Sequence, residues 1–423
     1  MQEIVMSIST KEFAVKNGFP YSDDLSILTA PVSGRGFTLK NAIAIQPMEG
    51  CDGTYDGAPG ELTYRRYERF AKGGAGLIWA EAISVCQEGR ANPRQLMLTE
   101  DNIDAFRKLT DIAHAHGAKI IAQLTHSGRW SRPVDVNAPI RAAYNAALDE
   151  RQQLAEDYPV ADDEYLASLP GLFGKSTRLA MEAGFDGVDI KACHLYLYSE
   201  LLGAFDRPGV YGGSYENRMR LLKDSVTEAK KYIGSGILAS RFNMFDGTAG
   251  RWGEDSEGNM DLSEPLRLVR ELSDMGVVLM NITMGTPYYN PHVNRPYNRG
   301  GYKPEETPDV GVRRLFEGVR AAQQAAPDAV CLATGFSWLG EHSANIAAGL
   351  IAEGGAKLAG FGRMSFAYPD LANDIIGHGQ IFRNKCCVTC SLCTKIMRAG
   401  GTTGCPVRDQ EVYLPILREV DGK

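Results

Sequence analysis

Eight short apolar runs, separated by longer segments with helical periodicity, dominate the chain after about its first 40 residues. The runs are continuously apolar, as strands are when helices cover one face and a packed barrel interior covers the other. Eight such strand-helix units predict one closed parallel (β/α)8 barrel, a TIM barrel of the α/β class. The runs lie at residues 42–46, 76–83, 119–124, 187–190, 236–241, 277–282, 329–334 and 357–362.

The segments between these runs predict helices. Gly117, Gly184 and Gly276 follow three of them, where a left-handed residue commonly ends a helix. Residues 130–165 and 283–309 are longer than barrel loops require and leave from the carboxyl ends of strands, the face that carries barrel active sites. We interpret them as candidate lids or substrate walls, with surface insertions as the alternative. The predicted helices are 61–72, 103–116, 175–183, 215–232, 264–275, 312–325 and 343–353.

Composition excludes several classes of protein. With 423 residues, 44% of them hydrophobic, the chain can bury a full core. A formal net charge of -7 argues against nucleic acid as a partner. The N-terminal sequence is unlike a signal peptide, and no apolar stretch is long enough to span a membrane. We therefore expect a soluble cytoplasmic protein without a membrane partner, whose cysteines stay reduced.

Five of the nine cysteines fall between residues 386 and 405. The spacing C-x2-C-x2-C-x11-C can bring four thiolates to one inorganic centre, and it favours a [4Fe–4S] cluster over a tetrahedral zinc ion. Cys386 is an alternative first ligand. A boundary near 377–379 divides the chain into a barrel of residues 1–378 and a short cysteine-rich segment, 379–423. The predicted cluster ligands are Cys387, Cys390, Cys393 and Cys405.

Several motifs at the predicted strand ends carry a family resemblance. They are Gln46-Pro47-Met48, Glu81-Ala82, the QLTHSGR sequence of residues 123–129, the AGFDGVDI sequence of 183–190, the YGGSYENR sequence of 211–218 and Phe361-Gly362-Arg363. With the cysteines, they make the chain resemble the Old Yellow Enzyme family of FMN-dependent ene-reductases. The iron–sulfur branch, which includes 2,4-dienoyl-CoA reductase and trimethylamine dehydrogenase, is the most similar. The resemblance covers residues 25 to 408.

The resemblance implies an FMN site. It places Pro47, Met48 and Glu49 along the isoalloxazine edge, Ala82 against the ring, Gln123 at the pyrimidine portion and Arg241 beside N1 and the C2 carbonyl. Otherwise Arg241 would be a surface residue at a strand end. For the phosphate, glycine allows close backbone approach and arginine supplies a bidentate cation. Gly335, Gly362 and Arg363 are therefore the phosphate candidates, with a salt bridge at the barrel rim as the alternative for Arg363.

The segment after the fourth predicted strand resembles the family's catalytic motif. By this resemblance Tyr196 protonates the α-carbon of the substrate, and Lys191 and His194 donate hydrogen bonds to its carbonyl oxygen. The alternative for Tyr196 is a core aromatic with a satisfied hydroxyl. Lys191 replaces a histidine common in relatives and suits an anionic substrate. Glu49 is a second departure from the family pattern. Its carboxylate either faces away from the flavin, acts as an acid or modulates the redox properties of the flavin.

The first functional hypothesis is an ene-reductase that reduces an activated C=C bond of a small molecule, with electrons relayed through a [4Fe–4S] cluster. The alternatives are an amine-oxidising dehydrogenase of the trimethylamine dehydrogenase type and a non-catalytic flavin- or zinc-binding subunit. Larger relatives continue into a region that binds FAD and NAD(P)H, but no G-x-G-x-x-G follows Cys405 here. We therefore expect an external donor, ferredoxin or a separate flavoprotein, with direct reduction by NAD(P)H as the competing view. The sequence leaves open whether the chain forms a homo-oligomer.

Overall fold

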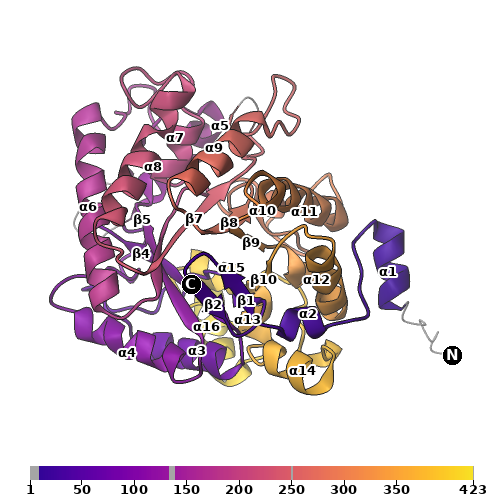
Figure 1. The fold of residues 1–423 in the computed structure, drawn as a ribbon. Helices are drawn as coiled ribbons and strands as arrows, with labels where there is room; N and C mark the ends of the chain where they lie inside the picture. Colours follow the sequence, from indigo (N-terminus) through magenta and orange to yellow (C-terminus); the bar gives the residue numbers. More distant parts are fainter. Residues whose placement is uncertain (1–8, 133–138, 249–250, 423) are drawn as a thin grey trace.

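Eight parallel strands form a closed barrel in the computed structural model, which describes residues 9–132, 139–248 and 251–422 (Figure 1). Each strand pairs with the next one in the chain, and the last closes the ring by pairing Ala359 with Ile43. The predicted TIM barrel is confirmed, since each apolar run holds one strand. The strands are β3 (Ile43–Ile45), β4 (Leu77–Ser84), β5 (Lys119–Thr125), β6 (Gly187–Ile190), β7 (Ile237–Asn243), β8 (Leu279–Thr283), β9 (Val330–Ala333) and β10 (Leu358–Phe361).

Helices surround the barrel, and they include all seven predicted from the sequence. Gly117, Gly184 and Gly276 have φ values of 68°, 89° and 95°, which confirms the left-handed helix ends. The third helix starts at Asp163 instead of 175, because the Asp162 side chain caps it by accepting from the Tyr165 N–H. The outer helices are α3 (Glu61–Lys72), α4 (Ile103–His114), α6 (Asp163–Glu182), α8 (Tyr215–Lys230), α9 (Ser263–Asp274), α11 (Pro308–Ala325), α12 (Ser343–Ala352) and α14 (Leu371–His378).

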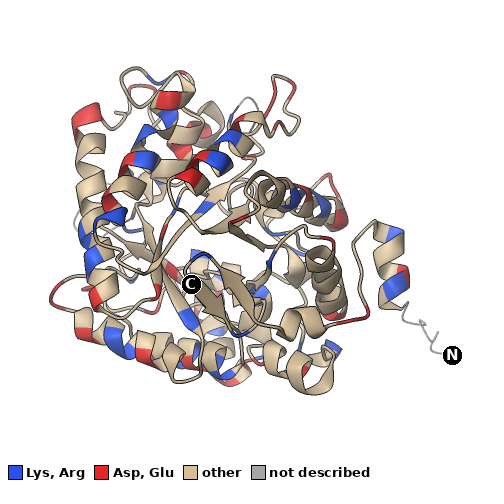
Figure 2. Cartoon of the chain, in the orientation of Figure 1, with Lys and Arg blue, Asp and Glu red and all other residues tan. Residues whose placement is uncertain are grey.

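Charge and burial follow this layering. Figure 2 shows basic and acidic residues interspersed along the outer helices, while the barrel strands carry few charges. The main core lies between strands and helices, where α3 buries Tyr67 and Phe70. Among the described residues, no helix has the length and apolar character needed to cross a membrane.

A hairpin closes the amino-terminal end of the barrel. Its strands β1 (Val32–Gly34) and β2 (Phe37–Leu39) follow two short helices, α1 (Thr10–Asn17) and α2 (Ser26–Thr29). Phe37 and Leu39 belong to the same buried cluster as residues near the starts of the barrel strands, including Leu77 and Val330. The opposite end, formed by the carboxyl termini of the strands, is therefore the one available for a binding site.

Short elements build the carboxyl-terminal face of the barrel, and the cysteine-rich segment packs onto it. Asp409 accepts hydrogen bonds from Arg65 and Arg69, and the Thr403 N–H lies 2.6 Å from the Gly50 carbonyl oxygen. Residues 133–138 of the first long loop lie outside the described residues. The short elements are η1 (Gly128–Trp130), α5 (Ala146–Gln152), α7 (Leu197–Leu202), α10 (Pro291–Asn294), η2 (Phe336–His342), α13 (Arg363–Ala367), η3 (Arg383–Lys385), α15 (Leu392–Arg398) and α16 (Gln410–Asp421).

Candidate active site and cysteine pocket

A cavity of about 1010 Å³, part of it open to solvent, lies at the carboxyl ends of the strands. A cavity with a few convergent polar groups at this face of a barrel is the usual place for a cofactor or a small molecule. It also takes Thr394, Met397 and Thr403 from the cysteine-rich segment as part of its wall. All the residues predicted to bind FMN or to catalyse line this one cavity: Pro47, Met48, Glu49, Ala82, Gln123, Lys191, His194, Tyr196, Arg241, Gly335, Gly362 and Arg363.

A buried carboxylate holds the side chain of Gln123 and the backbone of Arg241. Asp189 of β6 is fully buried and accepts hydrogen bonds from Gln123 Nε2 at 2.7 Å and from the Arg241 N–H at 2.6 Å. Trp79 Nε1 donates the third bond at 2.8 Å. Burial raises the pKa of Asp189, while the donors and the nearby Arg241 cation oppose that rise. This network orients the Gln123 side chain and fixes the backbone from which the Arg241 side chain leaves.

Three buried nitrogen atoms of the cavity lining have no hydrogen-bond partner among the described residues. They are Gln46 Nε2, Arg241 Nε and Arg363 Nη1. Buried donors of this kind are costly unless a ligand or water satisfies them. Carbonyl and phosphate oxygens are suitable acceptors, so this donor set fits FMN. Arg241 is buried inside β7, so the alternative of a surface residue is wrong.

The predicted phosphate residues lie where the last two strands end. Gly335 has a φ of 104°, a conformation that favours glycine, and Gly362 directly follows β10. Arg363 is 6% exposed, and its Nη2 donates to the Pro296 carbonyl at 2.5 Å. It makes no ion pair within the described residues, which excludes a salt bridge at the rim as its explanation there.

The position of the His194 ring proton follows from its neighbour. Asn294 Nδ2 lies 2.9 Å from His194 Nε2 and 3.2 Å from the Met284 carbonyl oxygen, which can only accept. Nδ2 is therefore the donor, His194 Nε2 is the acceptor, and the proton of a neutral ring sits on Nδ1. Burial and the cations Arg241 and Lys191 hold the pKa of His194 well below its usual value, so the ring is neutral at pH 7.

Lys191 and Glu49 bring two titratable groups into the same cavity. Burial lowers the pKa of Lys191 to about 8. Desolvation raises the pKa of Glu49 to about 7, and the Lys191 charge opposes this rise. Asn92 Nδ2 donates to Glu49, which lines the cavity, so the alternative that it faces away is wrong. Both groups therefore change charge close to physiological pH.

Tyr196 is 3% exposed and precedes the short helix α7. Its hydroxyl lies 2.9 Å from the hydroxyl of Tyr288, and Lys191 Nζ lies 3.6 Å from the centre of its ring. Burial, then the neighbouring Tyr288 and Glu49, hold the pKa of Tyr196 well above its usual value. The side chain therefore stays protonated, as a proton donor must, and its hydroxyl is also satisfied by a protein partner.

The four predicted cluster cysteines line a second, smaller cavity of about 350 Å³. Cys393 and Arg363 line both cavities, so the two adjoin. Cys386 does not line the second cavity; it is 4% exposed and its thiol lies 3.5 Å from the Phe382 carbonyl oxygen. The arrangement therefore favours Cys387 over Cys386 as the first ligand, with two residues between it and Cys390. The four are Cys387, Cys390, Cys393 and Cys405.

The spacing of the sulfur atoms bears on what the second cavity can hold. Among the described residues, one group has three potential ligand atoms that all lie within 4.8 Å of one another. It consists of Cys86, Glu88 and His126. No three of the cysteine sulfurs are therefore that close together. Four thiolates on one zinc ion would lie about 3.8 Å apart, given a zinc–sulfur distance of about 2.3 Å. In this arrangement the sulfurs lie farther apart than a single tetrahedral zinc ion needs, so the spacing favours a larger inorganic centre.

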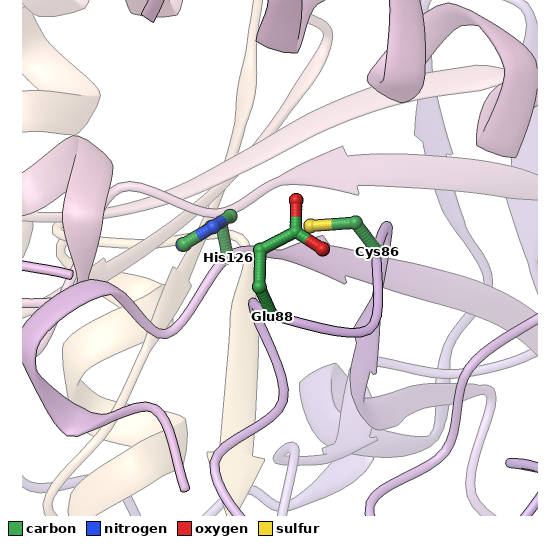
Figure 3. Close-up of side chains that lie close together, drawn as sticks. All are labelled: Cys86, Glu88 and His126. Carbon is green, nitrogen blue, oxygen red and sulfur yellow. The ribbon is translucent and has the colours of Figure 1, made fainter. Parts of the chain in front are cut away.

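Cys86, Glu88 and His126 lie close together (Figure 3), and none of them lines the first cavity. The Gly128 N–H donates to His126 Nδ1 at 3.0 Å, so the ring proton sits on Nε2. That nitrogen lies 2.8 Å from the Tyr165 hydroxyl, which donates to Glu88 at 3.4 Å. Because both ring nitrogens are engaged, His126 has no free lone pair for a metal ion.

Three residues of the second long loop were not predicted individually. Tyr288, Asn294 and Arg295 line the cavity, and two of them contact predicted catalytic residues. The sequence indicated the segment, since residues 283–309 were expected to form a lid or substrate wall. Nothing in it singled out these positions, because a Tyr, Asn or Arg in a loop is ordinary.

Comparison with known proteins agrees with this geometry. Residues 28–379 match the family model described as the NADH:flavin oxidoreductase / NADH oxidase family. The NADPH dehydrogenase of Geobacillus sp. (strain WCH70) is 32% identical over 265 residues, which cover 62% of this chain and 73% of that protein.

Two solved structures share the fold. The 2-naphthoyl-CoA reductase complex with 2-naphthoyl-CoA has a TM-score of 0.74 at 19% identity and covers 94% of this chain. The 6-hydroxypseudooxynicotine amine oxidase of Pseudomonas geniculata N1 has a TM-score of 0.72 at 19% identity and covers 93%. The matches span 58% and 56% of those longer chains.

Proposed function

The chain belongs to the NADH:flavin oxidoreductase / NADH oxidase family, and on that premise we propose that it reduces an activated C=C bond with FMN as the hydride donor. The chain is a flavin-dependent oxidoreductase. The observation that carries the finer proposal is that Lys191, His194 and Tyr196 line the same cavity as the residues expected to hold FMN.

Each of the three side chains has a separate role in this proposal. When bound, FMN supplies hydride from its N5 atom to the β-carbon of the substrate. His194 Nδ1–H and the Lys191 ammonium donate to the carbonyl or carboxylate oxygen, where negative charge develops. Tyr196, which is neutral at rest, gives its proton to the α-carbon. The substrate class is therefore an α,β-unsaturated carbonyl compound or carboxylate, and the charge on Lys191 favours an anionic one.

Amine oxidation is the second candidate, because the rings of Tyr196 and Tyr288 both line the cavity, where they could bind an amine cation. Lys191 weighs against it. Its Nζ already lies over the Tyr196 ring, and a second cation there would be repelled. Membership of an oxidoreductase family argues against the third alternative, a non-catalytic subunit.

A [4Fe–4S] cluster in the cysteine pocket is part of the proposal. Two observations support it. The four sulfurs lie farther apart than one zinc ion needs, and the cysteine pocket adjoins the large cavity. The cysteine pocket would pass electrons between FMN and an external donor, a ferredoxin or a flavoprotein. NADPH is the competing donor, since relatives are named NADPH dehydrogenases.

The test is an anaerobic assay of the purified protein. Dithionite or NADPH first reduces the flavin, and reoxidation is then followed with a panel of enones, enoates and enoyl thioesters. We expect fast reoxidation by at least one enoate or enone, and a slowing of about 10²- to 10⁴-fold in Tyr196→Phe. Equal reoxidation rates in Tyr196→Phe and the unmodified protein would show that Tyr196 is not the proton donor. Reoxidation by none of the panel contradicts the ene-reductase proposal.

A further inference from the structure

The hydroxyl of Tyr288 is the hydrogen-bond partner of the Tyr196 hydroxyl, and it does not itself give a proton to the substrate in the proposed reaction. The hydroxyl oxygens of Tyr196 and Tyr288 lie 2.9 Å apart and share a hydrogen bond. Within the described residues, neither hydroxyl makes another hydrogen bond. A hydroxyl can donate once and accept twice. If Tyr288 donates to Tyr196, the Tyr196 proton stays free to point at a substrate.

The ring of Tyr288 is held rigidly. It stacks on Trp130 with ring centres 4.4 Å apart and an interplanar angle of 13°. Trp130 is itself fixed, because its Nε1 donates to the Leu195 carbonyl at 2.9 Å. Leu195 directly precedes Tyr196, so one tryptophan positions both members of the tyrosine pair.

The backbone before Tyr196 needs such support. His194 and Leu195 have φ values of 66° and 55°, a left-handed conformation that costs energy for residues other than glycine. Thr286 Oγ1 donates to the His194 carbonyl at 2.8 Å, and it accepts from the Tyr288 N–H at 3.3 Å. The loop that carries Tyr288 therefore also stabilises the turn that carries Tyr196.

The two tyrosines differ in exposure. Tyr196 is buried, whereas Tyr288 is partly exposed. A proton that leaves Tyr196 must be replaced before the next turnover. Among the described residues, the Tyr288 hydroxyl is the group hydrogen-bonded to the Tyr196 hydroxyl, so the shortest route for that proton passes through Tyr288.

We propose that Tyr288 is a positioning residue that orients the Tyr196 hydroxyl and returns the proton that Tyr196 has given to the substrate. This inference rests on the proposed function. Hydride from reduced FMN and the Tyr196 proton together add two electrons and two hydrogens to the C=C bond. The Tyr196 phenolate then takes the proton of the Tyr288 hydroxyl, and Tyr288 regains a proton from water at the cavity edge.

The test compares Tyr288→Phe, Tyr196→Phe and the double variant, with cyclohexenone reoxidising the dithionite-reduced protein. Phenylalanine keeps the stack on Trp130 and removes only the hydroxyl. We expect Tyr288→Phe to slow reoxidation about tenfold, as for the loss of one hydrogen bond to a charged group. In the Tyr196→Phe background, the second substitution should change nothing, because Tyr288 acts through Tyr196. Tyr289→Phe, the same change one residue further, is the control.

Two results overturn the inference. One is an unchanged reoxidation rate in Tyr288→Phe, and the other is an equal slowing in both backgrounds, which indicates a purely structural role. The proposed function fails in a different way, if cyclohexenone and the enoate panel leave the unmodified protein reduced.

A substrate-independent measurement keeps the inference testable in that case. Tyr196→3-chlorotyrosine places a phenol whose ionisation can be followed by absorbance. Tyr288→Phe should raise the pKa of that phenol, because the phenolate loses its hydrogen-bond donor. An unchanged pKa contradicts the inference.

Discussion

The large cavity takes its lining from strand ends spread between Gln46 and Arg363, whereas the cysteine pocket takes four sulfur atoms from the short stretch between Cys387 and Cys405. The first exists only when the barrel has closed. The second is encoded locally, and its spacing can be identified in the sequence. The two share Arg363 and Cys393. The large cavity is assembled from distant parts of the chain, so its shape depends on buried residues that support its walls. The cysteine pocket depends mainly on the inorganic centre that we propose for it.

The largest expected effect tests whether the two cavities are independent. Cys390 lines only the cysteine pocket, so Cys390→Ala should abolish iron binding and leave FMN in place. Iron and flavin contents of the purified protein give the measurement. Cys393→Ala, which alters both cavities, should also change the flavin spectrum.

The matched control is Cys386→Ala, since Cys386 lies outside the cysteine pocket. It should keep both iron and flavin. Loss of flavin in Cys390→Ala would show instead that the large cavity depends on an intact inorganic centre.

The buried support of the large cavity is tested next. Arg66 is 3% exposed and forms ion pairs with Asp52 and Glu81, which also accepts from the Gly50 N–H beside the cavity wall. Arg66→Met leaves two buried carboxylates without their cation. We expect the free energy of unfolding to fall by about 3–5 kcal/mol. Chemical denaturation measures it, with Arg107→Met on the surface as the control; equal stability of the two variants would contradict this view.

The shared wall is tested by Arg363→Met. Arg363 has one unpartnered buried nitrogen and is the cation of the predicted phosphate site. Loss of its charge-assisted bonds should weaken FMN binding by about 10- to 100-fold. Titration of the apoprotein with FMN and with riboflavin, which has no phosphate, gives the comparison. The variant should bind riboflavin as the unmodified protein does, and an equal loss for both ligands would place Arg363 away from the phosphate.

The smallest effect concerns charge within the large cavity. As pH rises, Glu49 loses its proton near pH 7 and Lys191 loses its proton near pH 8. Both changes make the cavity more negative, so binding of an unsaturated carboxylate such as cinnamate should weaken about tenfold between pH 6 and pH 9, while cinnamamide binding stays constant.

Lys191→Met is the matched variant for this prediction. It should weaken cinnamate more than cinnamamide at pH 6 and remove the part of the pH dependence near pH 8. Equal effects on the two ligands would contradict the assignment of Lys191 to an anionic group.

The sequence predicted the barrel because each strand had to be continuously apolar and each helix amphipathic. It did not predict the hairpin of β1 and β2, whose three-residue strands carry too little periodicity to be detected. It also placed the start of α6 too late: a proline inside a segment normally signals a helix end, whereas α6 runs through Pro170 without a break.

By itself, the sequence determined the fold class and the cysteine spacing, because these follow from local patterns, while its resemblance to the family indicated most of the residues that converge at the strand ends. Only the tertiary structure decided which partners those residues have. Asn294 sets the proton position on His194, and Tyr288 contacts Tyr196. Such contacts join loops a hundred residues apart, and nothing local in either loop encodes the other.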